Sequence, residues 1–292
     1  MAAKKPASTA VANYDEELAR LAGAGASLTQ TTGGGKFFST RAGVLQFDDA
    51  PLPGNQVCAV IASWCLENVF YDGAYDPDNR TPPTCFAFCK DPSAVDEMGP
   101  PDIVDKEDAF ERQSDLCETC PQNEWGSAKT GRGKACSNRR RLAILPAGAY
   151  KPLGRTGGHE LELVEANGID VAIEHFTNAD AGFLKIPVMS GKGFDAYVKD
   201  IAGGLPDGKF RPLFAVYTRI YLTPDPKSQF KVNFELIEPV SEELIPTLLA
   251  RYKKLHDEID FPYTPFTEDE AAPTQTRSAA ADKKLTKPKA RR

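Results

Sequence analysis

The 292 residues of this chain predict a mainly β protein of the α+β class, built on one small β-barrel of the OB type. Three observations lead to this prediction. Runs rich in β-branched and aromatic residues recur along the chain, separated by turn-forming residues. Residues 76–137 interrupt these runs with a long irregular stretch rich in Pro, Gly and Asp. Small OB-type barrels accommodate such insertions between strands, and a β-sandwich is the alternative.

The expected elements begin near residue 36. Strands are expected at 36–47, where a turn divides the segment, and at 56–75, 139–148 and 182–190. Alternating residues in 211–240, interrupted by a Pro/Asp/Ser turn, predict a hairpin. Two helices are also expected, one after Ser190 as N-cap and one over about 241–260 that Ser241 opens.

These elements define one domain with flexible ends. Residues 1–35 are rich in Ala, Gly, Ser and Thr, and residues 267–292 are acidic first and basic at the end, so neither segment is expected to pack. The core is expected over 36–266, with the insertion at about 76–141. The sequence shows no internal repeat.

The composition excludes several classes of protein. No stretch approaches the roughly eighteen apolar residues that a membrane-spanning helix needs. No apolar core follows the two lysines near the N-terminus, so a secretory signal is not expected. We therefore expect a cytoplasmic protein without membrane contact. In a reducing compartment, seven cysteines of irregular spacing indicate metal binding or catalysis rather than disulfide bonds.

The cysteines of the insertion predict a structural zinc site. Cys117 and Cys120 form a C-x-x-C pair followed by turn-forming residues, and Cys136 lies sixteen residues after Cys120. A tetrahedral Cys₄ site needs a fourth thiolate, which Cys85 or Cys89 could supply; we favour Cys85. Binding of Zn²⁺ would then organise the irregular stretch.

Other interpretations of the cysteines remain open. The C-x-x-C pair could be a redox motif, although no thioredoxin-like βαβ pattern surrounds it, or the thiols could cluster by chance. Cys58 and Cys65 lie in an apolar run and are expected to be buried. The three histidines are far from the cluster in sequence, which favours structural over catalytic zinc.

Cations and a tryptophan follow the C-x-x-C pair. The segment 129–141 contains six basic residues and no acidic one: Lys129, Lys134, Arg132, Arg139, Arg140 and Arg141. Fixed cations suit phosphate oxygens, and Trp125 could stack on a nucleic-acid base. The alternatives are a solvated loop and a tryptophan that covers the zinc lobe. Arg219 in the expected hairpin is a further candidate nucleic-acid contact in a cationic, aromatic-lined groove. Arg219 and Lys231 should share a face with neighbours of the same parity while aromatic residues of the other parity pack inward, and the sequence does not determine which sheet face forms the groove.

The quoted pattern resembles a known family. The segments "PTC" (83–85) and "CETCPQNEWGSAKTGRGKACSNRRRLAIL" (117–145) resemble a group of bacteriophage proteins that bind single-stranded DNA through an OB-type fold with a zinc lobe. The similarity covers about 36–240, and its later parts are weaker. The resemblance implies zinc ligands at Cys85, Cys117, Cys120 and Cys136. It also implies a role in phage DNA replication or recombination, in the cytoplasm of the infected host, with phage replication proteins as partners. The basic C-terminal end departs from the acidic tail of many single-strand-binding proteins.

The sequence therefore favours a non-enzymatic protein that coats single-stranded DNA without sequence specificity. The alternative is a zinc-lobed protein that binds replication or transcription proteins through the helix 241–260 and "FPYTPF" (261–266). An enzyme is disfavoured because the sequence shows no nuclease-like carboxylate cluster, phosphate-binding loop or nucleophile–histidine arrangement.

Overall fold

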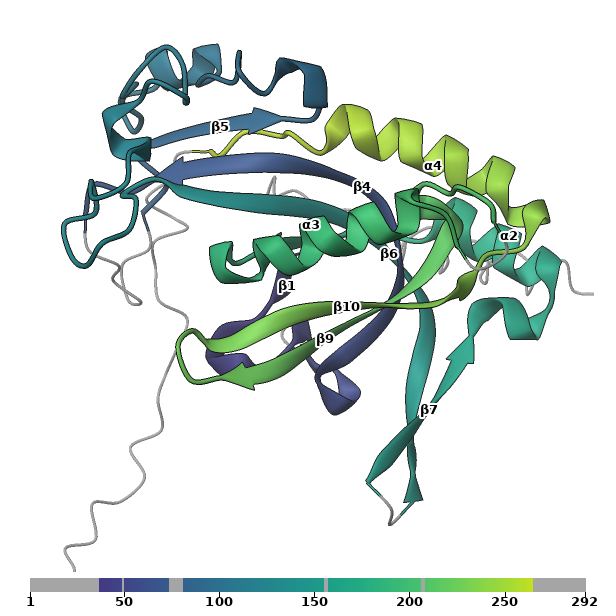
Figure 1. Cartoon of the computed structure of the whole chain (residues 1–292). Helices are drawn as coiled ribbons and strands as arrows, with labels where there is room; N and C mark the ends of the chain where they lie inside the picture. The colour runs from purple at the N-terminus through teal and green to yellow at the C-terminus, as the bar shows by residue number, and fades with distance from the viewer. Residues whose placement is uncertain (1–36, 49, 74–80, 155–156, 206–207, 265–292) are drawn as a thin grey trace, which may run out of the picture. The chain divides into compact units, whose positions relative to one another are not determined.

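The computed structural model describes residues 37–48, 50–73, 81–154, 157–205 and 208–264 (Figure 1). The ends that we expected to be flexible, 1–35 and 267–292, lie outside this range. The described strands are β1 Phe37–Ser39, β2 Gln46–Phe47, β3 Ala50–Pro51, β4 Gln56–Phe70, β5 Cys85–Cys89, β6 Ser137–Leu153, β7 Gly158–Leu163, β8 Gly182–Ile186, β9 Val216–Asp225 and β10 Gln229–Pro239. The described α-helices are α2 Ile169–Asn178, α3 Val188–Ala202 and α4 Ile245–Glu258. The fold is thus mixed α+β and consists mostly of sheet. No described helix is long and apolar enough to cross a membrane.

The described strands form an open sheet. Their order is β10-β9-β4-β6-β8-β1-β2-β3, with β5 paired to β4 and β7 paired to β6. A barrel needs its first and last strands to pair, and among the described strands β10 and β3 do not. The expected closed OB-type barrel is therefore not formed. Strand β3 has two residues, of which Pro51 lacks an N–H, so it is poorly suited to a closing ladder.

The chain divides into two compact units, and the divisions fall within β4 and β6. We call the described residues 37–66 and 139–260 the sheet unit, and 67–138 with 261–264 the loop unit. The insertion expected at about 76–141 falls largely within the loop unit.

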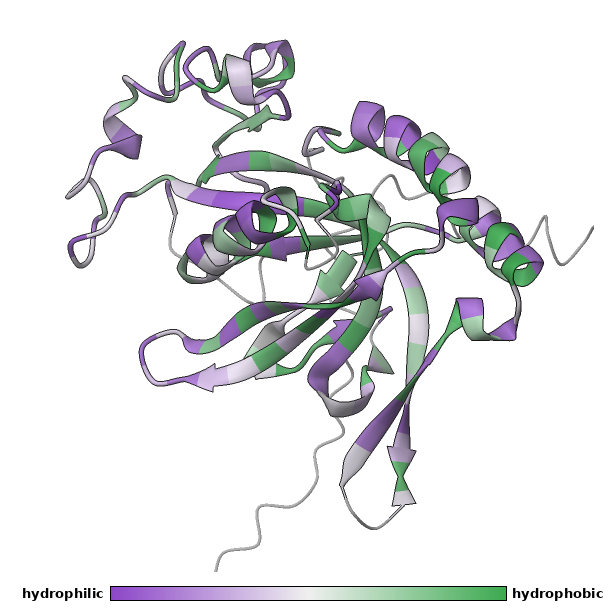
Figure 2. Cartoon of the chain, turned by 45° about the vertical axis from the view of Figure 1, so that its right-hand side comes forward, coloured by the Kyte–Doolittle hydropathy of each residue, from purple (hydrophilic) through white to green (hydrophobic). Residues whose placement is uncertain are grey.

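The core of the sheet unit explains the apolar run after residue 56. Strand β4 is buried along most of its length, as expected for a strand covered on both faces. Its Val57 and Ile61 pack with Leu142 of β6 and with Phe194 of α3. Figure 2 shows hydrophobic residues along the central strands, while the helices carry both kinds of residue. Helices α2 and α4 lie side by side in this unit (Figure 1).

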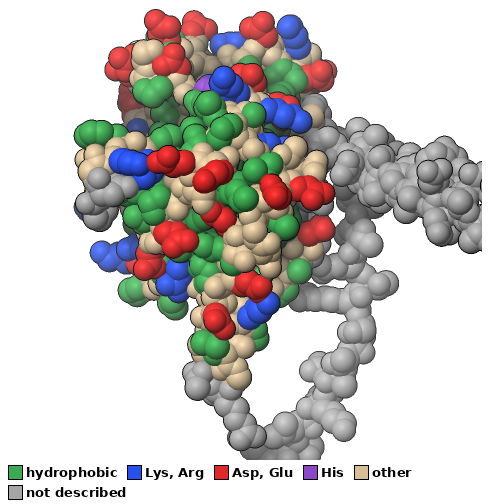
Figure 3. Space-filling view, turned by 90° about the vertical axis from the view of Figure 1, so that its right-hand side faces the viewer, with side chains coloured by type: hydrophobic (Ala, Val, Ile, Leu, Met, Phe, Trp, Pro, Cys, Tyr) green, Lys and Arg blue, Asp and Glu red, His purple; other side chains and the backbone are tan. Residues whose placement is uncertain are grey.

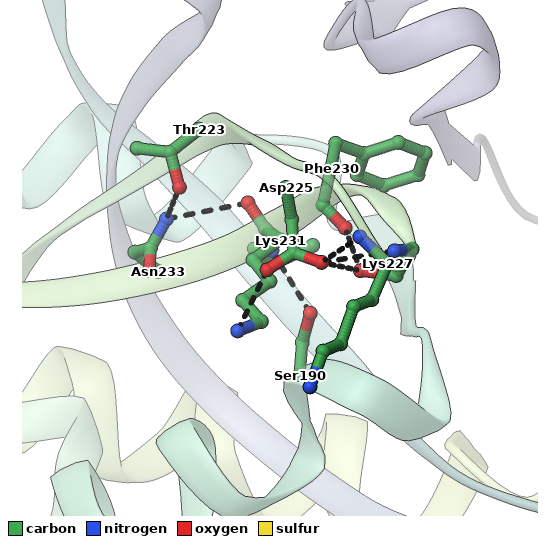
Figure 4. Close-up of polar contacts among 9 residues, drawn as sticks. Ser190, Thr223, Asp225, Lys227, Phe230, Lys231 and Asn233 are labelled. Atoms are coloured by element: carbon green, nitrogen blue, oxygen red, sulfur yellow. Dashed lines mark hydrogen bonds and ion pairs between the residues drawn. The ribbon is translucent and has the colours of Figure 1, made fainter.

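The predicted hairpin is confirmed as the antiparallel pair β9–β10, with a bulge between Leu236 and Glu238. Ile220 and Val232 face the core, and Phe234 packs against it. Asp225 accepts hydrogen bonds from the backbone N–H groups of Lys227 and Ser228 at the turn. The contact with Lys231 Nζ, followed by these backbone hydrogen bonds, holds the pKa of Asp225 well below its usual range (Figure 4).

The predicted N-cap of α3 is wrong, whereas Ser241 occupies the N-cap position of the 3₁₀ turn that runs into α4, as predicted. Helix α3 begins at Val188 after Pro187, so Ser190 lies inside its first turn and is buried. The Ser190 hydroxyl accepts a hydrogen bond of 2.9 Å from the backbone N–H of Val232 (Figure 4). Ser241 precedes a 3₁₀ turn, Glu242–Leu244, and makes no side-chain cap. The hydrogen bond between Ser190 and Val232 therefore connects α3 to β10.

The loop unit has its own small apolar core. Phe86 and Phe110 pack edge to face with ring centroids 5.2 Å apart, and Val69 and Val104 join the same cluster. Tyr263 lies 5.2 Å from Phe86 and donates a hydrogen bond to Glu67 Oε1. This aromatic cluster is what organises the irregular stretch, since burying such side chains contributes about 1.5–3 kcal/mol each.

Candidate nucleic-acid interface

Four cysteines come together in the loop unit. Cys85 lies in β5, Cys117 and Cys120 precede the 3₁₀ turn Pro121–Asn123, and Cys136 precedes β6. All four line one cavity of about 20 Å³ beside Phe70 and Phe86. The backbone N–H of Cys136 donates to Gln122 O at 2.7 Å, and that of Cys117 donates to Met98 O at 2.8 Å. Backbone contacts thus fix two of these cysteines.

The predicted zinc site is wrong. Among the residues that the structure describes, no group of three or more His, Cys, Asp or Glu side chains is placed so that it could hold a metal ion. Burial raises the pKa of Cys136 to about 12 and raises the pKa of Cys85 and Cys117 as well, so these thiols are protonated at neutral pH. Cys85, Cys117 and Cys136 therefore act as small apolar side chains beside the aromatic cluster, because protonated thiols pack as hydrophobic groups.

The remaining cysteines lie elsewhere. Cys89, the alternative fourth ligand, does not line the cavity, and its thiol donates to Asp91 O at 3.0 Å. Cys58 and Cys65 are fully buried, as predicted. Burial, followed by the nearby carboxylate of Glu238, raises the pKa of Cys58 to about 12.

The segment 122–136, which we call the Trp125 loop, is held by its own hydrogen bonds. The N–H groups of Gly126 and Ala128 both donate to Gly133 O, at 3.0 and 3.2 Å. The Ser127 hydroxyl donates to Glu124 O at 2.7 Å and accepts from the N–H of Ala135 at 2.9 Å. Gly126 has a φ of +94°, a conformation that glycine adopts without strain. The loop is therefore a defined turn structure.

Trp125 stands out on this loop because its side chain is 80% exposed. A tryptophan that covered a protein lobe would be largely buried, so the interpretation of Trp125 as apolar cover does not fit this exposure. An indole presented to solvent on a fixed loop offers an open ring face.

Three cations accompany Trp125 on the loop. Lys129 forms an ion pair of 2.9 Å with Asp72, and both side chains are about 70% exposed. The Lys134 ammonium donates to Asn123 Oδ1 at 3.1 Å. Arg132 is exposed between two glycines. Since an exposed ion pair contributes little to stability, a phosphate oxygen can replace Asp72 as the partner of Lys129 at small cost.

The arginine run 139–141 belongs to the sheet unit and does not form one patch. Arg140 makes a two-point contact with Asp195 of α3, at 3.0 and 2.8 Å. Arg141 is 1% exposed and donates to Ile259 O at 3.1 Å. Arg139 is half-buried. Because successive strand residues point to opposite faces, the run cannot present three cations together. We therefore leave Arg141 out of the candidate interface.

Arg219 lies on the face of β9 opposite to Ile220, and its side chain is 38% exposed. It donates to Gln56 Oε1 at 2.7 Å and to Glu235 Oε2 at 3.0 Å, and its guanidinium lies 4.5 Å from the centroid of the Tyr221 ring. In the register of the sheet, Arg219 of β9 pairs with Cys58 of β4 and with Glu235 of β10. Lys231 of β10 pairs with Thr223 of β9. Arg219 and Lys231 thus share a face, as the alternation predicted. Both already contact a carboxylate.

Positive charge is local on this protein. On the face shown in Figure 3, Lys and Arg side chains are interspersed with Asp and Glu side chains. The structure also exposes Phe210, a residue that the sequence patterns did not single out; its side chain is 76% exposed. Its position between Lys209 and Arg211 is the signal in the sequence that points to it.

No protein-family model, curated protein or solved structure matches this chain. Function must therefore be argued from the residues and their geometry.

Proposed function

We propose that this protein binds single-stranded DNA without sequence specificity and without catalysis, and that the Trp125 loop is its principal contact. The observation that carries the proposal is the 80% exposed Trp125 side chain on a loop fixed by its own hydrogen bonds. Because the loop is already ordered before binding, less conformational entropy is lost when the ligand binds.

The chemistry of the loop supports this ligand. Stacking of a base on an aromatic side chain contributes about 1–3 kcal/mol and tolerates any base. Lys129, Arg132 and Lys134 supply cations for the phosphates on either side of a stacked base. In a duplex the bases already stack on one another, so an indole favours the single strand.

The sequence resemblance of residues 83–85 and 117–145 to phage single-strand-binding proteins points to the same ligand, but the described residues form neither the closed barrel nor the zinc site that this resemblance implied, so the proposal rests on the Trp125 loop. The resemblance suggests a role in phage DNA replication or recombination, in the cytoplasm of an infected bacterium and alongside phage replication proteins. The net charge of −6 suits a protein that must stay soluble and release its strands.

Intrinsic fluorescence tests the proposal directly, since the chain has two tryptophans. Trp64 is half-buried and packs edge to face on Phe194, with ring centroids 5.4 Å apart, so Trp125 should dominate any response to ligand. We expect oligo(dT) to quench the fluorescence of the wild type, and Trp125→Ala to bind about 5- to 100-fold more weakly by fluorescence anisotropy.

The controls separate stacking from charge. Trp125→Phe should keep most of the affinity while losing the quenching, and a duplex of equal length should bind poorly. Equal affinity for duplex and single strand, or unchanged affinity in Trp125→Ala, would show that the loop does not recognise single strands.

The alternative function, binding of a partner protein, was expected to use the helix 241–260 and residues 261–266. In the structure α4 buries Leu248 and Leu255, and Tyr263 packs in the aromatic cluster of the loop unit. The side chains of Leu248, Leu255 and Tyr263 therefore already pack within their own units. If oligo(dT) does not bind, a protein that recognises the exposed Trp125 becomes the better explanation, since tryptophan is frequent in binding hot spots.

A further inference from the structure

We propose that Phe210, with its neighbours Lys209 and Arg211, forms a second stacking contact for single-stranded DNA, located in the sheet unit. This inference rests on the proposed function and extends it to a site that the sequence did not indicate. Phe210 and Trp125 are 76% and 80% exposed, whereas the other large apolar side chains of the described residues are at most 55% exposed.

The backbone on both sides of Phe210 is anchored. Leu205 and Leu213 are buried, before and after the segment. The N–H of Leu205 donates to Lys209 O at 3.1 Å, and the N–H of Gly208 donates to Leu205 O at 2.8 Å. Phe210 therefore projects from a short, tied segment between α3 and the 3₁₀ turn Leu213–Ala215.

One edge of the Phe210 ring lies close to Gly204, and the side chain is 76% exposed. A Cβ atom built on Gly204 would lie 3.6 Å from Phe210 Cε1, which is an ordinary van der Waals contact. Gly204 has a φ of +103°, a conformation that favours glycine. The ring is thus positioned and still exposes most of its surface.

The charges beside Phe210 suit a phosphate. The Lys209 ammonium lies 2.8 Å from Glu242 Oε1, with side chains 58% and 83% exposed. Lys209 and then Arg211 lower the pKa of Glu242. The exposed ion pair between Lys209 and Glu242 contributes little to stability, so a phosphate oxygen can replace Glu242 as the partner of Lys209 at small cost.

A new fluorophore at this position tests the inference. In a Trp125→Phe background, Phe210→Trp should preserve binding to oligo(dT), and the new tryptophan should be quenched when the oligonucleotide binds. With Trp125 present, Phe210→Ala should weaken binding about 5- to 100-fold. Glu242→Gln should strengthen binding, because it removes the carboxylate that competes with phosphate for Lys209. A purely structural role of Phe210 would not produce the quenching.

Val171→Ala is the matched control. Val171 is 48% exposed on α2 and follows Asp170 rather than a cation, so its loss should leave binding unchanged. If the wild type binds oligo(dT) and Trp125→Ala weakens it, but Phe210→Ala does not and the indole introduced by Phe210→Trp is not quenched, the second contact is refuted and the proposed function stands. If the wild type fails to bind oligo(dT), the proposed function itself fails. Thermal unfolding of each variant verifies that the fold is retained.

Discussion

Arg139, Arg140 and Arg141 are consecutive cations in the sequence, and the structure gives them different environments. Arg140 contacts Asp195, Arg141 is buried against the carbonyl of Ile259, and Arg139 is half-buried. A basic run in a strand distributes its charges over two faces. In the Trp125 loop, by contrast, glycines keep Arg132 exposed.

Cys58 provides a prediction at the residue scale. Its folded-state pKa of about 12 exceeds the ordinary thiol value of 9.0, so the folded protein holds the proton more tightly than the unfolded chain. The stabilisation is fully present below pH 9 and is lost as the pH rises toward 12, because only the unfolded chain ionises in this window. Each pH unit should cost about 1.4 kcal/mol for this thiol.

Urea unfolding at several pH values measures this effect. Cys58→Ala should be less stable at neutral pH because it leaves a cavity, and its stability should decline less steeply between pH 9 and 12. Identical slopes in the wild type and the variant would mean that Cys58 does not contribute to the alkaline loss of stability.

At the scale of elements, α3 is tied to β10 by one buried hydrogen bond. Ser190→Ala would leave the N–H of Val232 without this acceptor in a buried position. An unsatisfied buried donor costs about 1–3 kcal/mol, so the free energy of unfolding should fall by this amount.

Ser241→Ala is the matched control for this prediction. Ser241 precedes the turn before α4 but makes no side-chain cap, so its loss should change stability by less than about 0.5 kcal/mol. Urea denaturation of both variants provides the comparison. Equal stabilities would show that the Ser190 hydroxyl contributes nothing to holding α3.

At the scale of the whole molecule, the net charge of −6 contrasts with the local cations of the Trp125 loop. Binding driven by local phosphate contacts should weaken with salt despite the net negative charge. For single strands, the slope of log affinity against log salt is about −0.7 for each phosphate contact. Replacing Lys129, Arg132 or Lys134 by Gln should each reduce the slope by about that amount.

Arg141 is not a suitable residue for this series. Arg141→Met would remove a buried hydrogen bond, so any change in binding would reflect altered folding rather than a lost phosphate contact. Arg112→Gln is the better control: Arg112 lies in the same unit but forms a close ion pair with Asp105, so the salt slope should not change. If the slope stays constant in all three loop variants, the loop cations do not contact phosphate.

The sequence by itself determined the α+β class, the hairpin expected within residues 211–240 and the buried strand after residue 56. These features follow from local periodicity, turn chemistry and glycine content, which act over a few residues. The sequence also indicated the side chains available for stacking and phosphate contact, although it did not show which of them face solvent.

Only the tertiary structure decided the rest, because the decisive contacts join residues far apart in the chain. The open sheet depends on which strands pair, and the burial of Arg141 depends on Ile259, 118 residues away. The spacing of the cysteines suggested a zinc site. In the structure these cysteines instead line a small cavity beside an aromatic cluster that includes Tyr263. Likewise, only the structure shows that Phe210 is exposed while Leu205 and Leu213 are buried. The periodicity of the sequence indicates the face of a helix or strand on which a residue lies. Tertiary packing alone determines what covers that face.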